Sequence, residues 1–477
     1  MAKKQVNVSD VTIEKIDIES SFGKYDLVPH LEELNIYESI FSNHLQAHIT
    51  LQDSFNIPFK LPIIGEETID VSIRLEGDEG NTIINPPMLH VHDLSDRFLK
   101  TNQSQRFSLN LVSAQYMSNV HCRVSKSFSG MTADEIVHDI WANYLDDGHG
   151  DLYTEPSKRE EQCIIPNWTP HQAFNWLAKR TQPEDGFGSD HAANYLYYET
   201  MDGVHFQSLN KLANEPLDDE GNVKPVLTFA QEHLAKDPAK IESLAGGLVK
   251  VDSITYMGQF EKVKNINEGQ YSSKMITHDI VKKKILQHDY DGFTEWLWVN
   301  HLGPFPPLSN SDTEVKSGHI ARTSFAPPVD PSMAVIEGRR LSDLTDSAVV
   351  LYPKHDKMYA QNFGHEHDNK VEEWKLRRAA QMVSYDGIMM QVECSGLSFV
   401  RVGMTVILNV ASPETTSHGK QDVAFDKFLT GIYMITAIRH MFNNDKGSTG
   451  YKMMLELTKD GLDDVATSRV PREQGNE

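Results

Sequence analysis

Alternation of apolar and polar residues is the feature that most restricts how this sequence can fold. Runs such as His48–Leu51 and Ile69–Leu75 alternate in this way, and turn-forming segments such as Asp53–Pro58 and Gly77–Asn81 separate them. A period of two is typical of strands that bury one face, and Gly, Pro, Asn and Asp interrupt such strands. We therefore expect residues 1–113 to form a β-barrel or a β-sandwich.

Helical patterns begin after this region. The capping box Thr132–Glu135 precedes apolar residues at helical spacing and predicts a helix that continues to about Leu145. Thr169–Pro170 has the N-cap and first-turn residues of a second helix, and residues 371–385 show the period of a third. The segment 114–225 therefore combines helices with strands.

Two stretches far apart in the sequence share one layout. Residues 89–115 and residues 433–460 each consist of a strand, a polar turn and a returning strand. This echo is compatible with two related β domains, although any two hairpins share as much.

Composition limits the class of protein. The hydrophobic fraction is 39%, and no run of residues reaches the ~18 apolar positions of a membrane span. We expect no secretory signal at the N-terminus, which lacks an apolar h-region. Cys122, Cys163 and Cys394 are widely spaced, which argues against a disulfide framework. With 45 basic and 68 acidic side chains the net charge is −23, which disfavours tight DNA binding.

The most conspicuous candidate ligands are His365–Asp368, with His355 ten residues earlier. A His-x-His pair can chelate zinc or nickel. The same stretch precedes a predicted helix, where Asp368 or Asn369 serves as a cap. We favour the cap.

Nucleophile and carboxylate patterns are weaker. Cys163 and His171 are eight residues apart, but Cys163 begins an apparent strand and no GxSxG motif is present. Gly246–Gly247 is too short for a phosphate loop. Acidic pairs occur beside turns or chain ends, where charge is usually solvated: Glu32–Glu33, Asp146–Asp147 and Asp463–Asp464. We assign no catalytic, cofactor-binding or metal-ligating residue, expect no cofactor and no enzymatic activity, and leave the interface residues unassigned.

Aromatic residues mark one further segment. Trp296 and Trp298 precede the proline-rich stretch 300–307, which can form a sugar-stacking or protein-docking loop. Core packing is the simpler interpretation of these side chains.

Several ordered blocks of the sequence resemble the baseplate central hub proteins of T-even-like contractile-tail phages (myoviruses). The blocks are Tyr37–Ile40, Asp53–Ser54, Leu61–Glu67, 124–140, 163–180, 198–209 and 431–440. Agreement is weakest across residues 285–370. The hub family is also similar in architecture to the N-terminal part of type VI secretion spike proteins, and we expect no appended spike segment in this chain.

The resemblance implies a fold and a domain order. The fold is α+β and β-rich, with two homologous tail-tube-like β-barrel domains and α/β domains inserted between and outside them. The expected domains are a first β-barrel domain (1–113), an α/β domain (114–225), the first part of a second β-barrel domain (226–290), a divergent insertion with Pro/aromatic loops and a helix (291–385), the rest of the second β-barrel domain (386–460) and a polar C-terminal tail (461–477).

The resemblance also implies a role. Three subunits would form a ring that adapts the six-fold tail tube to the three-fold central spike. DNA would pass through the lumen without specific binding. The implied partners are the tail tube or tube-initiator protein, the central spike protein and the baseplate wedge proteins, with no membrane insertion. The implied location is the tail baseplate of the virion, after assembly in the host bacterial cytoplasm.

Two alternatives from other classes stay open. A tail-associated host-surface adhesin would place the aromatic residues of 293–307 on a glycan. A tail-associated hydrolase would need His365–Asp368 to bind a metal ion.

Overall fold

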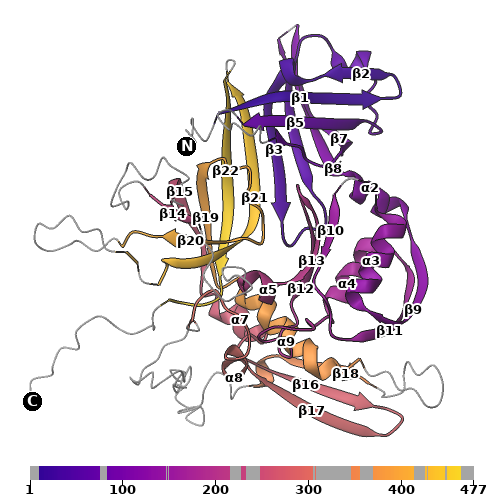
Figure 1. Cartoon of the computed structure of the whole chain (residues 1–477), viewed down its shortest axis with the longest axis vertical. Coiled ribbons are helices and arrows are strands. Elements are labelled where there is room, and N and C mark those ends of the chain that lie inside the picture. Colours follow the sequence, from indigo (N-terminus) through magenta and orange to yellow (C-terminus); the bar gives the residue numbers. More distant parts are fainter. Residues whose placement is uncertain are drawn as a thin grey trace, which may run out of the picture.

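The chain is an α+β protein rich in β structure, as the sequence predicted. The computed structural model describes residues 10–75, 83–101, 103–146, 148, 150–214, 227–231, 248–304, 307, 345–354, 369–412, 425–426, 428–445 and 448–463. Within these ranges, one sheet of 14 strands runs through the molecule and three small sheets lie beside it (Figure 1).

The N-terminal part of the large sheet is named here the first β unit. Its strands are β1 (Asp10–Ser20), β2 (Gly23–Asp26), β3 (Leu31–Ser39), β4 (Gln46–Asp53), β5 (Thr68–Leu75), β6 (Ile83–Ile84), β7 (Leu89–Thr101) and β8 (Ser104–Ser113), with the short helices η1 (Val28–His30) and α1 (Ile57–Lys60). Ile49 and Leu51 of β4 are buried whereas Gln52 is exposed, so the predicted alternation separates core from surface.

The C-terminal part of the large sheet is the second β unit. It consists of β14 (Thr228–Ala230), β15 (Leu248–Gln259), β19 (Ile388–Ser395), β20 (Thr405–Asn409), β21 (Gly431–Asp445) and β22 (Ser448–Lys459). Each of these six strands pairs with two others of the six, in the order β15-β19-β22-β21-β20-β14 and back to β15.

One strand order occurs in both units. In the first, the chain order β3, β4, β5, β7, β8 gives the spatial order β3-β4-β8-β7-β5, with every neighbouring pair antiparallel. In the second, the chain order β15, β19, β20, β21, β22 gives the spatial order β15-β19-β22-β21-β20, again antiparallel throughout. The hairpins that the sequence pattern suggested, β7–β8 and β21–β22, occupy equivalent places in this order.

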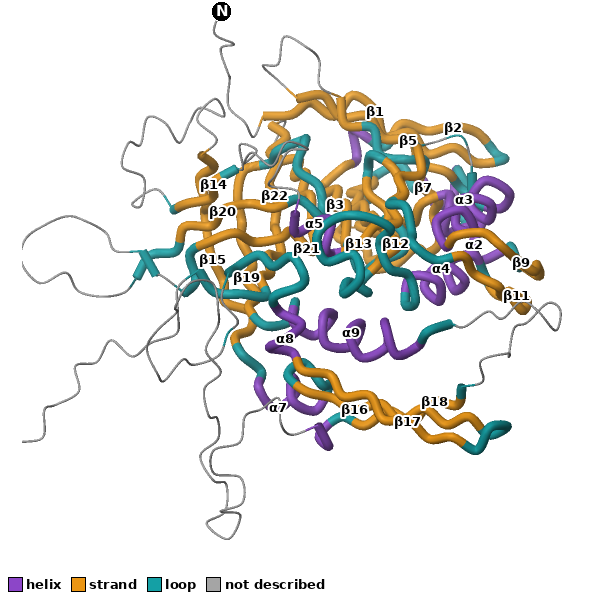
Figure 2. The backbone as a smooth tube through the Cα atoms, turned by 60° about the horizontal axis from the view of Figure 1, so that its bottom comes forward, coloured by secondary structure: helices purple, strands orange, loops and turns teal. Residues whose placement is uncertain are grey.

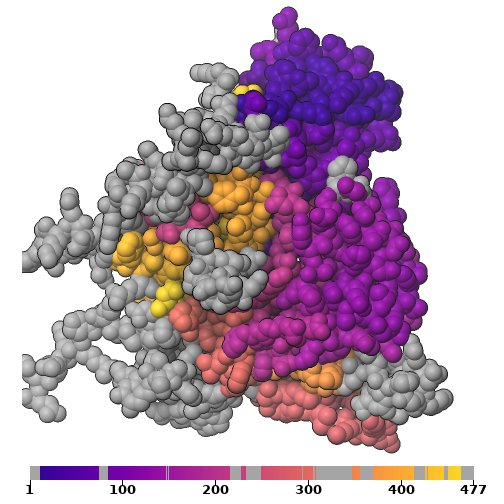
Figure 3. All heavy atoms as spheres, in the orientation of Figure 1, coloured from indigo at the N-terminus to yellow at the C-terminus, as the bar shows by residue number. Residues whose placement is uncertain are grey.

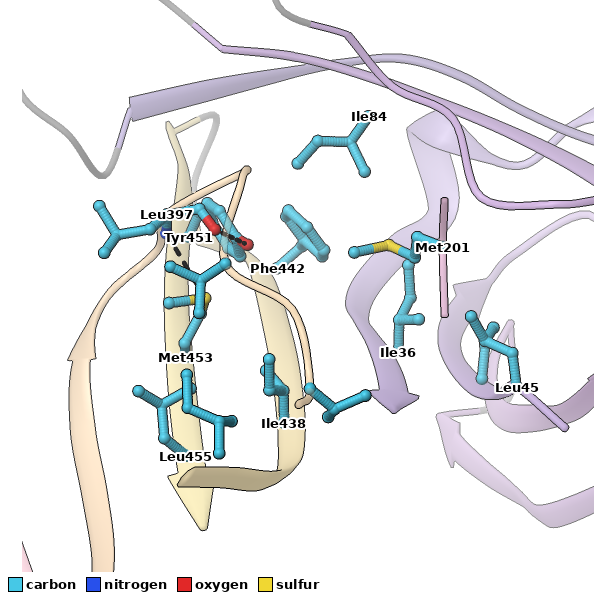
Figure 4. Close-up of a cluster of buried hydrophobic side chains, with 14 of the residues drawn as sticks. Ile36, Leu45, Ile84, Met201, Leu397, Ile438, Phe442, Tyr451, Met453 and Leu455 are labelled. Atoms are coloured by element: carbon cyan, nitrogen blue, oxygen red, sulfur yellow. Dashed lines mark hydrogen bonds between the residues drawn. The ribbon is translucent and has the colours of Figure 1, made fainter. Parts of the chain in front are cut away.

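The two β units share a seam and a core. Strands β3 and β21 pair over seven residues, from Glu33 opposite Asn443 to Ser39 opposite Ala437. A single cluster of buried apolar side chains crosses the seam. Figure 4 shows Ile36 of the first β unit near Phe442 of the second, whose ring stacks on Tyr451 at a centroid distance of 4.5 Å.

In the sequence, the α/β unit (residues 114–214) follows the first β unit and precedes the second. It contains α2 (Ala114–His121), β9 (Val124–Thr132), α3 (Ala133–Tyr144), β10 (Asp151–Thr154), β11 (Glu160–Trp168), α4 (Pro170–Ala178), β12 (Tyr195–Thr200), β13 (Gly203–Ser208) and α5 (Leu209–Asn214). Both predicted helix starts are confirmed: Thr132 and Thr169 are N-caps with capping boxes, and Pro170 lies in the first turn of α4.

The segment between β15 and β19, residues 260–387, is the outer unit. It contains α7 (Lys262–Asn267), β16 (Ser272–Asp279), β17 (Lys284–Asp291), α8 (Gly292–Trp296), η6 (Thr345–Ser347), β18 (Val349–Pro353) and α9 (Val371–Ser384). Strands β16, β17 and β18 form a sheet of their own. Figure 2 shows α9 between this sheet and the rest of the molecule. Met275 and Tyr290 of the sheet and Trp374 of α9 share a small core.

The helix predicted for residues 371–385 is confirmed, but its expected cap is not. The N-cap is Lys370, with φ 41°, and its side chain makes no capping hydrogen bond. Asn369 instead accepts hydrogen bonds at its carbonyl oxygen from Trp374 and Arg159. The interpretation of Asn369 as a cap was wrong because a left-handed residue follows it, and Asp368 lies outside the described residues.

Candidate functional site

An ion pair in the interior joins three parts of the chain. Arg401, from the loop between β19 and β20, has its Nε atom 3.9 Å from Oε1 of Glu38 on β3. The same guanidinium binds the carboxylate of Asp202 in the β12–β13 turn, at 2.7 and 2.8 Å. Glu38 also accepts a hydrogen bond of 2.8 Å from the backbone N–H of Met201. The first β unit, the second β unit and the α/β unit therefore meet at one buried cluster.

Burial changes the protonation of this cluster. It raises the pKa of Glu38 to about 7, although the charge of Arg401 and the hydrogen bond from Met201 oppose the rise. His440 on β21 is also buried, and its Nδ1 lies 2.8 Å from the hydroxyl of Tyr451. Burial lowers the pKa of His440 to about 3, so the ring is neutral at neutral pH.

A second carboxylate fastens the α/β unit to the first β unit. Glu199 of β12 accepts hydrogen bonds from the backbone N–H of Leu45 at 2.9 Å and from the hydroxyl of Ser113 at 2.6 Å. Nearby, the amide of Asn43 donates to the carbonyl oxygen of Tyr197 at 3.0 Å. The turn before β4 and the end of β8 are therefore held against the same strand of the α/β unit.

The outer unit has polar attachments of its own. Glu295 of α8 accepts two hydrogen bonds from Arg377, at 3.0 and 3.1 Å, and lies 2.7 Å from Nδ1 of His191 in the α/β unit. Burial raises the pKa of Glu295, but these partners outweigh it and leave the pKa below its usual value. Asp460, just after β22, bonds His301 at 2.5 Å and the backbone N–H of Leu302 at 2.9 Å. Hydrogen bonds and ion pairs of buried or half-buried side chains therefore hold each unit against its neighbours.

A groove of about 770 Å³ lies on the outward face of the seam. Arg439 of β21 forms part of its wall and binds Glu33 at 3.1 Å and Asn35 at 2.9 Å across the β3–β21 ladder. His44 stacks on Tyr116 of α2 at a centroid distance of 3.9 Å. The groove offers amides, imidazoles and a paired guanidinium, which are groups suited to polar contacts.

The structure also disfavours Cys163 and His171 as a nucleophile pair, which the sequence did not support. Cys163 is buried in β11, where burial raises the pKa of its thiol to about 11. His171 is buried at the start of α4, and burial lowers the pKa of its ring to about 3. A protonated thiol and an imidazole that resists protonation form no thiolate–imidazolium pair.

The other candidates from the sequence have structural surroundings or fall outside the described residues. Trp296 stacks on His301 at 3.5 Å, which agrees with the packing interpretation, whereas Trp298 is half exposed beside His191. Glu32 pairs with Arg106. Five further candidates or pairs lie outside the described residues: His355, His365–Asp368, Gly246–Gly247, Asp147 and Asp464. Among the residues whose positions are described, no group of three or more His, Cys, Asp or Glu is arranged to hold a metal ion.

Sequence reasoning missed the buried cluster, although a signal for it exists. Glu38 falls on the same face of β3 as Leu34 and Ile36, and both of these are core residues. His440 falls on the same face of β21 as Ile438 and Phe442, which are also buried. A charged or titratable residue at an inward position of an alternating strand predicts a buried polar partner.

Helices in the described ranges lack the length and apolar character needed to cross a membrane. No protein-family model and no curated protein matches the sequence.

Several solved structures resemble the chain. The tail protein from Neisseria meningitidis MC58 is 12% identical, with a TM-score of 0.49 over 94% of this chain and 97% of that chain. The 43 kDa tail protein of prophage MuSo2 from Shewanella oneidensis is 12% identical, with a TM-score of 0.48 over 94% and 98%. The E. coli c3393 protein, a type VI secretion component, is 6% identical, with a TM-score of 0.39 over 94% and 76%. The structural neighbours of this chain are therefore phage tail and type VI secretion proteins.

Proposed function

We propose that this chain is a non-enzymatic structural subunit of a phage tail baseplate hub. Three copies form a ring that adapts the six-fold tail tube to the three-fold central spike. Each subunit contributes two homologous tail-tube-like β-barrel domains, the first and second β units. The ring lets DNA pass without binding it specifically.

The repeated strand order carries this proposal. Five strands in each β unit have the same chain order, the same neighbours and the same antiparallel pairing. A subunit with two equivalent domains places six similar domains around a ring of three copies, and six is the number that a six-fold tube requires. The ordered sequence blocks that resemble hub proteins support the same interpretation.

The buried attachments support a mechanical role. A ring that bears load needs its domains fixed relative to one another, and carboxyl side chains with several polar partners join the units here. These carboxylates are Glu38, Glu199 and Glu295. A buried polar or charged group that loses its partner is costly, so such junctions resist sliding.

The outer unit supplies the asymmetry that a second partner needs. It lies between β15 and β19 of the second β unit, while only the short turn 40–45 separates the equivalent β3 and β4 of the first. A ring of three therefore presents three outer units but six β units. We assign the β-unit face to the tail tube or tube-initiator protein and the other face to the central spike, with wedge proteins as further neighbours. The protein then resides in the virion baseplate after assembly in the host cytoplasm.

The net charge of −23 is compatible with a DNA passage that does not grip phosphates. Tight binding of DNA would need a cationic lining of the passage.

Co-purification tests the assigned partners. A tagged full-length chain, expressed with the tail tube and spike proteins of its phage, should retain both proteins through size-exclusion chromatography. Retention of neither protein, while the chain remains folded by circular dichroism, contradicts the proposed role.

A further inference from the structure

The turn between β16 and β17 has an unusual surface. Residues 280–287, with the sequence Ile-Val-Lys-Lys-Lys-Ile-Leu-Gln, form an unbroken exposed run at the end of the hairpin. The space-filling view shows the hairpin on the lower rim of the molecule (Figure 3). This run combines aliphatic side chains with three consecutive lysines.

The aliphatic residues at the turn are contrary to ordinary hairpin chemistry. Turns favour Gly, Asn, Asp and Ser, because these residues tolerate the backbone angles and solvate well. Here Ile280 is 68% exposed and Val281 is 72% exposed. The turn is nevertheless well formed, since a carboxylate oxygen of Asp279 accepts hydrogen bonds from the backbone N–H groups of Val281 and Lys282 at 3.0 and 2.8 Å. The fold therefore holds two apolar side chains out into solvent.

The apolar surface continues along the outer face of the sheet. Ile285 is 66% exposed on β17, and Leu351 is 69% exposed on the edge strand β18. The register places Leu351 beside Ile276 and places Ile285 beside His278 on the same face. The opposite face packs on α9 through Met275. Together with the turn, these residues form what we call the basic-apolar tip: Ile276, Ile280, Val281, Lys282, Lys283, Lys284, Ile285 and Leu351.

The charge of the tip is opposite to that of the chain. Three lysines stand in sequence at positions 282–284, whereas the whole chain has a net charge of −23. Exposed aliphatic residues next to clustered lysines are the composition by which peripheral proteins bind membranes: the lysines meet anionic headgroups, and the aliphatic groups enter the boundary of the acyl chains.

We propose that the basic-apolar tip attaches the protein to the surface of a membrane rich in anionic phospholipid. The contact is peripheral, because a turn and one sheet face reach the headgroup level without any segment crossing the bilayer. An acidic protein surface would satisfy the lysines but would leave Ile280 and Val281 in a polar environment. The bilayer surface satisfies both groups, and this inference is independent of the proposed hub role.

Vesicle co-sedimentation with the full-length chain tests the proposal. The probes are vesicles of phosphatidylcholine alone and of phosphatidylcholine with 30% phosphatidylglycerol. The chain should sediment with the anionic vesicles and not with the neutral ones, and 0.5 M salt should weaken binding because it screens the lysines.

Two double variants separate the charged and apolar contributions. K283Q/K284Q should weaken partitioning by about thirty-fold, since each lysine near an anionic surface contributes about a factor of five. I280S/V281S should weaken it by about ten-fold or more, because the aliphatic groups then gain nothing from the acyl boundary. Matched controls remote from the tip are the exposed Ile164 on β11 and Lys179 after α4. I164S and K179Q should partition like the natural sequence.

Three outcomes overturn the proposal. They are no sedimentation with anionic vesicles, equal sedimentation with neutral vesicles, or binding that the tip variants leave unchanged. Light scattering on the same samples identifies the main alternative: tip variants that change the oligomeric state of a chain that does not bind vesicles make the tip a contact between subunits. Thermal melts of each variant verify that it is folded.

Discussion

Glu38 on β3 and Arg401 in the β19–β20 loop lie 3.9 Å apart, although 362 positions separate them in the sequence. Strand β3 belongs to the first β unit and the loop belongs to the second, so this pair connects the two units of the proposed barrel repeat. The carboxyl group of Glu38 is completely buried, and Arg401 also forms an ion pair with Asp202 in the α/β unit. One guanidinium therefore connects the first β unit, the second β unit and the α/β unit.

Replacing that guanidinium should destabilise the protein strongly. At pH 8, where Glu38 is ionised, R401M leaves its carboxylate buried without a cation, and removal of one partner of a buried pair costs about 3–5 kcal/mol. The matched control is R439M, because Arg439 pairs with Glu33 on the partly exposed face of the seam, where a pair contributes about 1 kcal/mol or less. Urea unfolding measures both changes. Equal losses in the two variants would contradict the special role of Arg401.

The pKa of Glu38 predicts a specific pH dependence. Burial raises it from 4.5 to about 7, so between these values the folded protein holds a proton that the unfolded chain has released. The contribution of Glu38 to stability is therefore full below about pH 4.5 and is lost as the pH rises through about 7. E38Q does not titrate, so its stability relative to the natural sequence should rise between pH 5 and pH 8, by up to about 3 kcal/mol. A relative stability that stays constant or falls would show that the carboxyl is ionised throughout.

The buried His440 should act in the opposite direction. Burial lowers its pKa from 6.5 to about 3, so the unfolded chain binds a proton that the folded protein does not. Stability from this residue is present above pH 6.5 and is lost as the pH falls. The unfolding free energy of H440F relative to that of the natural sequence should therefore rise as the pH falls from 6.5 to 4.5, by about 1.4 kcal/mol per pH unit at most. Unfolding curves of the two proteins at each pH provide the comparison, and parallel pH profiles would refute this assignment.

Close packing inside the second β unit can be tested with a pair of glycines. A Cβ atom added at Gly396 would overlap the buried ring of Tyr451, whereas one added at Gly450 would meet nothing within 4 Å. Overpacking a core costs about 1–3 kcal/mol, so G396A should lower the unfolding free energy by that amount. G450A should leave it nearly unchanged. A neutral G396A would mean that Tyr451 does not occupy the position described.

Some of this architecture follows from the sequence, and some depends on distant contacts. Thr132 and Glu135 predict the start of α3 because a capping box is local chemistry. The cap proposed at Asn369 fails because Lys370 adopts a left-handed conformation, which the side-chain pattern does not reveal. Alternation of apolar and polar residues likewise identifies a strand, but it does not show which other strand pairs with it. The pairing of β16 with β18 and that of β3 with β21 therefore needed the structure.

The candidate site shows the same division. The inward position of Glu38 on β3 is readable from the alternation around it, but its partner Arg401 is not. Arg401 lies in a loop without periodicity, and only the fold brings that loop to the first β unit.

Projection images of the purified full-length chain by cryo-electron microscopy test the trimeric ring most directly. The ring predicts class averages with three-fold symmetry in which six similar lobes surround a central opening and three further lobes lie outside them. Light scattering on the same sample should give three times the subunit mass of 54.0 kDa. A compact monomer in every class, with a mass of one subunit even when the spike protein is present, would contradict the proposed hub.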